Sequence, residues 1–556
     1  MNGQLPQSSW LVAIAFVLLI GPFALDFHMH YPDEMYYSDA AVRMTQNGDY
    51  LTTFLGNGEL RFKKPILTYW AVLSGFNIFG ISAFSSRLFF LLAGALTVVL
   101  VYKIGKVTFG DKNIAILASF ITASHPVIIF SSTRSIPDIL LALFITLSAL
   151  GFAGLLRYGD NCPKKYLWML YVGLGLAFEV KGLPAVAFGG IGLLYLLINP
   201  WKRLSIEKLL YFPAIFVGLV IAVFWFVSMY LNYGTTYIES FYSDQVGIRV
   251  STQIIHVLTN LILATLLMGG MFFPWAFFGL QNLKKNIKLM LNENREFLGW
   301  VLVWIVSIIL MSAMVTKFYE RYLLPVVPLT AVGLAWLLSK NPTLSQSSGM
   351  TITLYVFGFL NILVIVFALL LNVGLGTPWY IYVGIFLGVM LVICLFFSRK
   401  DKNSAFSWLA ISIMLLFYNG SFITYQLSLP HQGKQIADFV ARNAIPKGSK
   451  IAFVGNLHHA SKIRIGLGNG YFLTNLSREN YMESLNEYDY LICEEDVKIQ
   501  LSHASFKAEP VSLNWDPKLI PEMVQGIFTG NSQKLLEQKG KKYYWIEGIY
   551  RSGNLK

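Results

Sequence analysis

Charged residues are scarce in this sequence. They make up 13 % of its 556 residues, about half of the usual share in a soluble domain. Hydrophobic residues account for 55 %, and many separate apolar runs are long enough to cross a bilayer. This composition excludes an ordinary water-soluble protein and predicts a polytopic membrane protein. Because backbone groups in lipid must bond to one another, we expect these runs to be helices.

Other features are missing as well. The three cysteines, Cys162, Cys394 and Cys493, are too few and too scattered for a disulfide framework, and none has metal-ligand spacing. The sequence contains no internal repeat and no low-complexity stretch. The first apolar run has no basic segment before it and no small-residue cleavage site after it, so we expect a retained anchor and not a signal peptide.

The apolar runs predict about thirteen membrane spans. A further run, residues 66–80, is short, and we interpret it as an interfacial or re-entrant helix. If it crossed the membrane instead, every later span would change direction. The predicted spans are 10–27, 86–103, 113–130, 137–156, 166–180, 182–198, 209–231, 258–280, 298–315, 321–338, 352–372, 379–397 and 406–426.

Basic residues decide the orientation of these spans, because Lys and Arg accumulate in cytoplasmic loops. Alternate loops carry seventeen basic residues: Lys103, Lys106, Lys112, Arg157, Lys164, Lys165, Lys202, Arg203, Lys208, Lys284, Lys285, Lys288, Arg295, Lys340, Arg399, Lys400 and Lys402. The opposite short loops after residue 130 carry five: Arg134, Lys181, Arg249, Lys317 and Arg321. We therefore place the N-terminus inside, and residues 28–65, 232–257 and the tail from about 430 outside. The net charge of +13 follows from this pattern, so we expect no nucleic-acid partner.

The chain thus divides into an all-α polytopic membrane domain, 1–429, with an outer catalytic loop at 28–85, and a small soluble domain, 430–556. In the tail, "SKIAFVG", "YDYLICEED" and "KKYYWIEGIYR" are typical of short strands, and "GKQIADFVARN" has helical periodicity. We expect a small α/β domain there. It contains neither a glycine-rich phosphate loop nor a nucleophile elbow.

Acidic residues at two outer span ends are candidates for chemistry. Asp33 and Glu34 follow the first span, and Asp138 follows Pro137 at the start of another, with Arg134 as a potential partner. Each acid also fits a plain helix start, where carboxylates cap and stabilise the first turn. The alternative is a functional site, because ionisable groups at a span end often face a cavity.

Basic residues lie in the same outer loops. In "RFKKPILTYW", Arg61, Lys63 and Lys64 precede an aromatic run. They fit either cations that snorkel from an interfacial helix or a site for a phosphate at the lipid surface. Further charges in the outer segments are Lys181, Glu239, Asp244, Arg249, Lys317, Glu320 and Arg321. Acids and cations from five outer loops therefore gather on one membrane face.

Several motifs together resemble a known family. They are "DE" followed by Tyr36 after the first span, "RFKKPILTYWAVLSGFNIFG", "RSIPD", "VKGLPAVAF" and "ERYLLPVVP". Over residues 10–430 their order is similar to that in family 39-type membrane glycosyltransferases of the C superfamily. This family comprises relatives of dolichyl-phosphate-mannose–protein mannosyltransferases, including bacterial aminoarabinose transferases that act on lipid A. The tail also resembles the periplasmic domain of the latter.

The resemblance implies an enzyme that transfers a sugar from a polyprenyl-phosphate donor at the outer face of the cytoplasmic (inner) membrane. Asp33 would correspond to the first-loop catalytic aspartate, with Glu34 beside it, and Asp138 to the second acidic position. Four cations would bind the donor phosphate: Lys64, Lys63, Arg321 and Lys181. The acceptor class stays open among a lipid A-like glycolipid, a glycan and a protein, and so does the sugar.

One departure from the family concerns a metal. The resemblance implies a glutamate before the lysine of "FEKP" and a later histidine as metal ligands, whereas this sequence has Lys63 and, near the second position, Gln245. A lysine cannot replace a carboxylate ligand. We therefore expect no metal or other cofactor, although His28, His30 and Asp33 are close enough in sequence to form an alternative site.

The chemistry is consistent with this interpretation. Cations neutralise the departing phosphate, Asp33 accepts the acceptor's proton, and a single displacement inverts the anomeric centre. The main alternative is a transporter or flippase for a lipid-linked or amphiphilic substrate, which predicts repeats and broken helices near the bilayer midplane. A sensor or scaffold is a third possibility, but it leaves Asp33, Lys64 and Asp138 unexplained.

Overall fold

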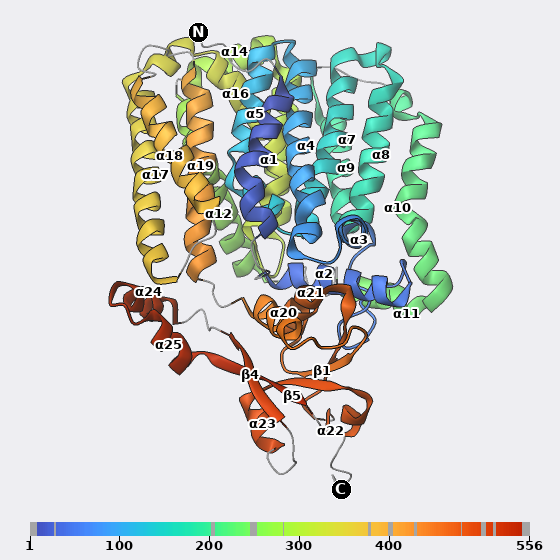
Figure 1. Ribbon diagram of the computed structural model, residues 1–556. Coiled ribbons are helices and arrows are strands. Elements are labelled where there is room, and N and C mark those ends of the chain that lie inside the picture. Colours follow the sequence, from blue (N-terminus) through green and yellow to red (C-terminus); the bar gives the residue numbers. More distant parts are fainter. Residues whose placement is uncertain are drawn as a thin grey trace.

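The computed structural model of the protein describes residues 8–26, 29, 31–201, 206–244, 253–281, 283–375, 380–397, 404–427, 431–479, 481–501, 507–514 and 519–547. A bundle of long helices stands above a small mixed domain (Figure 1). The bundle helices are α1 (Ser9–Asp26), α4 (Ala83–Phe109), α5 (Lys112–Ala123), α6 (Pro126–Ser132), α7 (Pro137–Tyr158), α8 (Lys164–Lys181), α9 (Leu183–Ile198), α10 (Phe212–Tyr233), α12 (Ile254–Met271), α13 (Trp275–Gly279), α15 (Arg295–Ala313), η4 (Glu320–Val326), α16 (Val327–Ser339), α17 (Ser348–Leu375), α18 (Tyr380–Phe397) and α19 (Ala405–Leu427).

Every predicted span coincides with one of these helices or with a consecutive pair of them. Seven of the described helical segments are long and apolar enough to cross a membrane, and α5 with α6, bent by 61°, would make an eighth. Four others, including α9, are apolar but shorter. The chain is therefore a multi-pass membrane protein, and the count of thirteen stays a prediction.

Four shorter helices lie at the ends of the bundle: α2 (Pro32–Asn47), α3 (Leu67–Phe79), α11 (Thr235–Tyr242) and α14 (Leu283–Glu293). In Figure 1, α3 is seen almost end on, across the direction of the bundle helices. It packs closely on α4, because a Cβ atom on Gly75 would lie only 1.9 Å from the Ser85 carbonyl oxygen. The run at 66–80 thus forms a short transverse helix at the bundle end, as the interfacial interpretation requires.

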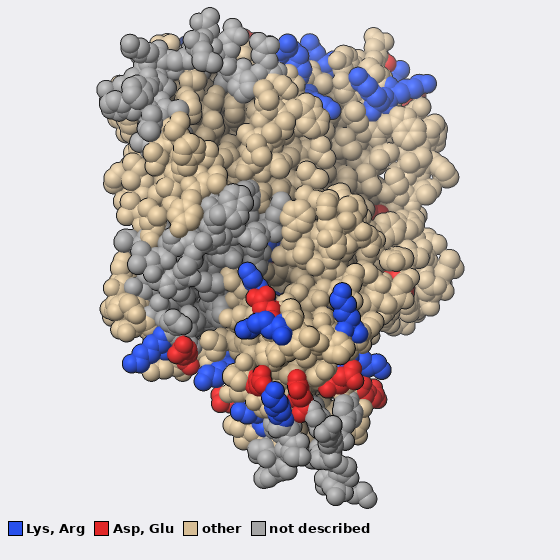
Figure 2. All heavy atoms as spheres, in the orientation of Figure 1, with Lys and Arg blue, Asp and Glu red and all other residues tan. Residues whose placement is uncertain are grey.

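The ends of the bundle differ in charge, as the orientation argument expects. α14, which carries Lys284, Lys285 and Lys288, lies at the upper end, and α2 and α11 lie at the lower end beside the small domain (Figure 1). Figure 2 shows Lys and Arg on the upper rim, an almost uncharged band below it, and both charge signs at the lower end. Six of the residues used for the charge argument, Lys202, Arg203, Arg249, Arg399, Lys400 and Lys402, lie outside the described ranges.

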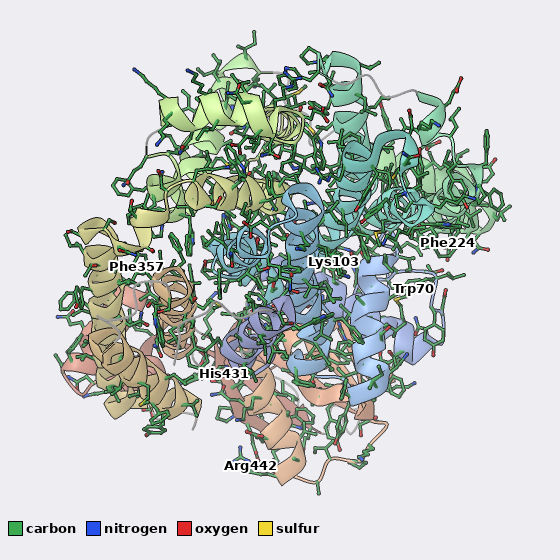
Figure 3. All side chains as sticks on the ribbon, turned by 90° about the horizontal axis from the view of Figure 1, so that it is seen from above. Trp70, Lys103, Phe224, Phe357, His431 and Arg442 are labelled. Atoms are coloured by element: carbon green, nitrogen blue, oxygen red, sulfur yellow. The ribbon has the colours of Figure 1, made fainter. Side chains whose placement is uncertain are left out.

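Two parts of the bundle are seen from above in Figure 3. The helices α17, α18 and α19 gather to one side, where Phe357 of α17 is labelled. On the other side, Trp70 of α3 lies against Phe224 of α10, with ring centroids 5.5 Å apart. The transverse helix is thus fixed between α4 and α10, close to the loop that carries Lys63 and Lys64.

The C-terminal domain is the α/β unit that the tail pattern predicts. Its elements are α20 (Gln432–Arg442), β1 (Lys450–Val454), α21 (Leu457–Leu467), β2 (Phe472–Leu476), α22 (Tyr481–Ser484), β3 (Tyr490–Glu494), α23 (Glu495–Gln500), β4 (Lys507–Asn514), α24 (Ile520–Phe528), α25 (Ser532–Lys539) and β5 (Lys541–Glu547). The strand order is β2-β1-β3-β5-β4. β1 pairs with β2 and β3 in parallel, and β5 pairs antiparallel with β3 and β4.

Candidate active site

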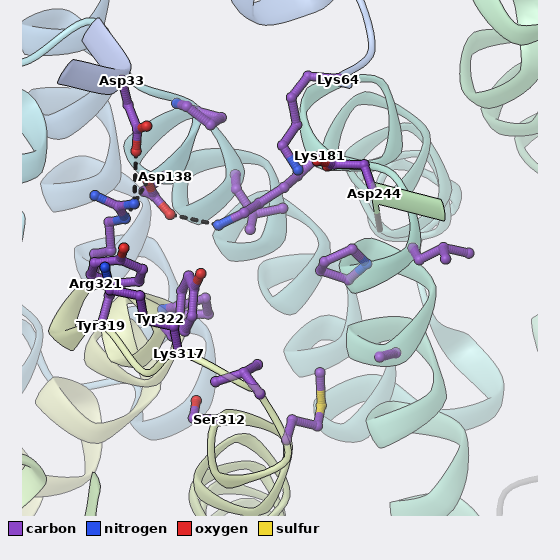
Figure 4. Close-up of a pocket in the computed structure, with 18 of the residues that line it drawn as sticks. Asp33, Lys64, Asp138, Lys181, Asp244, Ser312, Lys317, Tyr319, Arg321 and Tyr322 are labelled. Carbon is purple, nitrogen blue, oxygen red and sulfur yellow. Dashed lines mark hydrogen bonds and ion pairs between the residues drawn. The ribbon is translucent and has the colours of Figure 1, made fainter. Parts of the chain in front are cut away.

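A cavity of about 650 Å³ lies between the bundle and α2, and Figure 4 shows the side chains that line it. Six of the seven residues predicted to form the site line it: Asp33, Lys63, Lys64, Asp138, Lys181 and Arg321. They come from α2, the loop before α3, α7, α8 and η4. Folding thus brings together side chains that are almost 300 positions apart in the sequence.

The two aspartates of the cavity are joined by cations. An Nη atom of Arg321 donates to Asp33 at 2.8 Å, and its Nε lies 3.6 Å from Asp138. The Nζ of Lys181 donates to the other oxygen of Asp138 at 2.6 Å. The Asp33 side chain is 45 % exposed and that of Asp138 only 5 %. Asp33 is therefore the accessible acid, and Asp138 holds the two cations in place.

Local sequence explains where these acids lie. Tyr31 and Ile136 are extended, and Pro32 and Pro137 each open a helix, so Asp33 and Asp138 fall in the first turns of α2 and α7. Proline fits that position because its missing N–H would be unpaired in any case. A helix N-terminus also stabilises negative charge. The acids therefore lie at helix starts as expected, but neither caps its helix, because Tyr31 and Ile136 occupy the cap positions and no side-chain cap bond forms. Their side chains line the cavity.

The turn at Gly182 places Lys181. Gly182 ends α8 with a φ of 74° and precedes α9 directly. This left-handed conformation favours glycine, and a Cβ atom there would lie 2.9 Å from the Phe241 ring. The "KG" pair of the sequence therefore places Lys181 at the last position of α8, at the turn into α9.

Positive charge predominates in the cavity. Its lining contains six cationic side chains, namely Arg61, Lys63, Lys64, Lys181, Lys317 and Arg321, and three acids, namely Asp33, Asp138 and Asp244. Lys64 is almost completely buried, whereas the Lys63 side chain is 56 % exposed and its Nζ lies 3.9 Å from Asp244. Such a surplus of donors suits an anionic group, above all a phosphate.

The other part of the lining is apolar. It consists of Leu141 from α7, Leu183, Pro184, Ala187 and Phe188 from α9, Ile308 and Met311 from α15, and Met314, Val315 and Pro325 near η4. The cavity therefore joins a charged end to a hydrocarbon surface between bundle helices. An amphiphile with an anionic head and an apolar chain fits both parts.

Sequence reasoning missed two aromatic contributors. Tyr319 and Tyr322 line the cavity on either side of Arg321. The guanidinium carbon of Arg321 lies 4.5 Å from the Tyr319 ring centroid, and the Lys181 Nζ lies 5.2 Å from that of Tyr322. The alternating Tyr319–Arg321 spacing in "FYERY" was the available signal, because aromatic faces restrain neighbouring cations.

Glu34 does not line the cavity, in contrast to our expectation. It is completely buried. Its two oxygens accept from Nε and Nη of Arg87 at 2.5 and 2.8 Å, and one of them also accepts from the Ser135 amide at 3.1 Å. Burial and these bonds leave it no access to a substrate, so it joins α2, α4 and the loop before α7.

Arg134 also differs from its expected place. Its guanidinium lies over the rings of Tyr31 and Phe130, 4.4 and 5.7 Å from the centroids. The partners of Asp138 are Lys181 and Arg321 instead. The predicted Arg134–Asp138 pair assumed that residues four apart face the same side of one helix. Arg134 instead lies in the loop before α7, so its side chain points elsewhere.

The C-terminal domain contacts the same helix that carries Asp33. Asp39 of α2 and Arg464 of α21 form a completely buried ion pair. Burial lowers the pKa of Arg464 to about 9, so it remains charged at neutral pH. Arg43 donates to the Leu473 carbonyl at 3.1 Å, and Tyr36 packs on His458 with ring centroids 4.9 Å apart. The C-terminal domain therefore supports α2 directly beside the cavity.

The residues around Lys63 do not fit a divalent cation. Where the family resemblance implies a carboxylate ligand, the Lys63 ammonium faces Asp244. No group of three His, Cys, Asp or Glu side chains with metal-binding geometry occurs in the described part of the chain. His28, His30 and Gln245 lie outside that part. The expectation of a metal-free site therefore stays a prediction.

Comparisons with known proteins show similarity in sequence and in fold. Residues 63–227 match the family described as dolichyl-phosphate-mannose-protein mannosyltransferase. An uncharacterized protein of Aquifex aeolicus is 28 % identical over 329 residues, 59 % of this chain and 63 % of that protein. The undecaprenyl phosphate-alpha-4-amino-4-deoxy-L-arabinose arabinosyl transferase of Yersinia enterocolitica is 30 % identical over 192 residues, 34 % of each chain. This chain thus spans less than two thirds of the length of either relative.

The fold extends the likeness to almost the full chain. The crystal structure of ArnT from Cupriavidus metallidurans bound to undecaprenyl phosphate superposes with a TM-score of 0.71 at 16 % identity, and covers 96 % of this chain and 97 % of that one. The apo form of the same protein gives a TM-score of 0.70. Residues 63–227 are thus similar in sequence to the dolichyl-phosphate-mannose-protein mannosyltransferase family, and nearly the whole chain has the fold of ArnT.

Proposed function

We propose that this protein transfers a sugar from a polyprenyl-phosphate donor to an acceptor, which is a lipid A-like glycolipid, a glycan or a protein. The observation that carries the proposal is the cavity, which combines an excess of cations with an apolar wall and one accessible carboxylate. A donor of this class has a phosphate, a long hydrocarbon chain and a sugar. The cations suit its phosphate, the wall between α9 and α15 suits its chain, and Asp33 lies where the sugar would meet the acceptor.

The reaction exchanges one bond at the anomeric carbon. The acceptor oxygen attacks this carbon while the bond to the phosphate oxygen breaks, and the configuration inverts. Asp33 takes the proton of the acceptor hydroxyl. Polyprenyl phosphate departs with the electron pair, and Lys64, Lys63 and Arg321 offset its negative charge. No nucleotide takes part, in accordance with the lack of a phosphate loop.

Arg321 connects the donor to the base. It donates to Asp33 and approaches Asp138, and a guanidinium has five N–H groups. Arg321 can therefore bind a donor phosphate and still keep its contact with Asp33 or with Asp138. Donor binding would draw positive charge away from Asp33, which makes this carboxylate more basic when the acceptor arrives.

The location of the site completes the proposal. We place the cavity and the C-terminal domain on the outer face of the cytoplasmic (inner) membrane, on the basis of the charge asymmetry. A variant without native cysteines allows a test, with single cysteines at Asn57, beside the cavity end, and at Lys285, on α14. A membrane-impermeant maleimide should label Asn57→Cys and not Lys285→Cys in intact spheroplasts. The reverse pattern would contradict the orientation.

A donor assay tests the activity. Purified protein in nanodiscs is incubated with synthetic undecaprenyl-phosphate sugars and an extract of envelope acceptors, and released undecaprenyl phosphate is measured. We expect release that requires both donor and acceptor, with an inverted anomeric centre in the product. A transporter would release none. The transporter alternative is less favoured, because the named relatives are transferases and the ionisable groups of the cavity lie at the end of the bundle.

A further inference from the structure

A second cavity, of about 350 Å³, lies in the C-terminal domain. Its lining is almost entirely polar: Gly455 and Asn456 follow β1, His459 lies on α21, Arg478 follows β2, Glu494 ends β3 and Lys541 begins β5. These residues come from five separate parts of the domain. The hydrophobic cores on either side of the sheet do not require such a polar hollow.

The topology of the sheet indicates that a ligand binds at this position. From β1 the chain moves through α21 to β2 on one side, and it then crosses to β3 on the other side of β1. The connections therefore diverge between β1 and β3. In open α/β sheets, ligands bind outside the carboxyl ends of the strands at such a divergence. Gly455, Asn456 and Glu494 lie at the carboxyl ends of these two strands.

The charges in this cavity favour an anionic ligand. Arg478 donates to Glu494 at 2.6 Å and to Asp496 at 2.8 Å, which fixes its guanidinium. Glu494 also accepts from Tyr543 at 2.9 Å, so its charge is largely compensated. Lys541, in contrast, has no carboxylate within ion-pair distance among the residues that the structure describes. One ammonium group therefore remains to bind an anion.

The neutral groups of the cavity suit hydroxyls. Burial, with help from nearby Lys462, lowers the pKa of His459 to about 4, so the ring is uncharged at neutral pH. Its Nδ1 lies 3.0 Å from Gln432 Oε1 and 3.0 Å from the Tyr543 hydroxyl. Asn456 accepts from the His458 amide at 2.9 Å and keeps its own NH₂ group as a donor. An anionic sugar combines both types of group.

This cavity adjoins the contact between the two domains. His458, next to His459, packs on Tyr36, and the Arg61 guanidinium also contacts this ring, 4.4 Å from its centroid. Tyr36 is on α2, three residues after Asp33, and Arg61 lines the first cavity. His458, Tyr36 and Arg61 thus form a chain of contacts from the second cavity to the first.

We propose that the second cavity binds the anionic group of a sugar acceptor, a phosphate or a carboxylate, and so presents its hydroxyl to Asp33. This inference rests on the proposed transfer reaction. Lys541 binds the anion, and Asn456 and His459 bind hydroxyls of the same sugar. A glycan or glycolipid acceptor has this chemistry, whereas a neutral peptide does not.

Direct binding measurements test this site without any transfer. Full-length protein in nanodiscs is titrated calorimetrically with glucose 1-phosphate, glucuronate and glucose, so that phosphate, carboxylate and neutral sugars are compared. We expect the anionic sugars to bind and glucose not to bind. Lys541→Gln should weaken binding about tenfold, the value of one charged hydrogen bond. Lys507→Gln is the matched control, because Lys507 lies on β4 and pairs with Glu509 outside the cavity.

A second variant guards against a folding artefact. Asn456→Asp retains a side-chain oxygen for the helix cap but places a carboxylate in the cavity, so anion binding should fall while the melting temperature stays unchanged. Equal binding of anionic and neutral sugars, or no effect of Lys541→Gln and Asn456→Asp, would overturn the site and leave the transfer reaction standing. Normal sugar binding by a protein that consumes no donor would instead overturn the transferase, and the acceptor role with it.

Discussion

Helix α2 carries one exposed acid and two buried acids. On one face, Asp33 is 45 % exposed, lines the first cavity and accepts from one arginine. On the other faces, Glu34 and Asp39 are completely or almost completely buried and each is paired with a buried arginine, Arg87 and Arg464. The three carboxylates lie within seven consecutive residues. Their roles therefore follow from access and partners, and not from their proximity in the chain.

This contrast separates chemistry from support. A base must reach its substrate, and the exposed side chain of Asp33 satisfies this condition. A buried carboxylate with several donors is fixed in the charged state, and its loss leaves an uncompensated cation. Glu34 and Asp39 hold α2 between the bundle and the C-terminal domain, so that Asp33 is presented at a constant position.

The largest effect should come from Asp33. We expect Asp33→Asn to lower kcat about a hundredfold or more, because general-base catalysis contributes at least this much, with little change in melting temperature. Donor consumption and thermal unfolding are measured on the same sample. Glu59→Gln serves as control, since Glu59 is exposed in the loop between α2 and α3 and does not line the cavity. A variant that keeps more than about a tenth of the activity would contradict the general-base role.

Glu34→Gln should show the opposite pattern. It leaves Arg87 buried without its counter-charge, which costs roughly 3 kcal/mol of stability. We expect a clearly lower melting temperature, while the folded fraction retains most of its activity at low temperature. Fluorescence-detected size-exclusion after heating measures the first, and the donor assay at low temperature the second. A strong loss of kcat with unchanged stability would return Glu34 to the catalytic set.

Arg464 tests the support from the other side of α2. Asp39 and Asp33 are six residues apart, about 9 Å along a helix, so a small rotation at the ion pair moves the base. Arg464→Met should lower kcat about tenfold, the effect that a small displacement of a catalytic group can have, without changing the KM of the donor. Arg464→Lys, which keeps the charge, should restore much of the activity. An unchanged kcat in Arg464→Met would show that the domain contact does not position Asp33.

Much of this arrangement could be predicted from the sequence, because membrane helices and proline-initiated helix starts are local features. The helices coincide with the predicted spans, and six of the seven predicted site residues line the first cavity, while their roles stay predictions. What failed depended on the direction of side chains in three dimensions. Glu34 and Asp33 differ by one position on α2, about 100° around a helix, and only packing decides which of them faces the cavity. The Asp39–Arg464 pair joins residues more than 400 positions apart, and no local pattern indicates it.

The smallest effect should be that of metal removal. Lys63 stands where the family resemblance implies a glutamate ligand, and it faces Asp244 across 3.9 Å. The ammonium already supplies the positive charge that a cation would bring to this side of the cavity, so EDTA treatment should leave the donor turnover unchanged. Elemental analysis of the treated sample gives the control.

Lys63→Glu sharpens the test, because it puts a second carboxylate beside Asp244 and creates the oxygen ligands that divalent cations prefer. This variant should lose activity without metal, since a negative charge then faces the donor phosphate. Added Mn²⁺, Zn²⁺ or Mg²⁺ should restore part of the activity in Lys63→Glu and have no effect on the unaltered protein. Loss of turnover of the unaltered protein in EDTA, reversed by one of these ions, would mean that Lys63 has not taken the place of a metal.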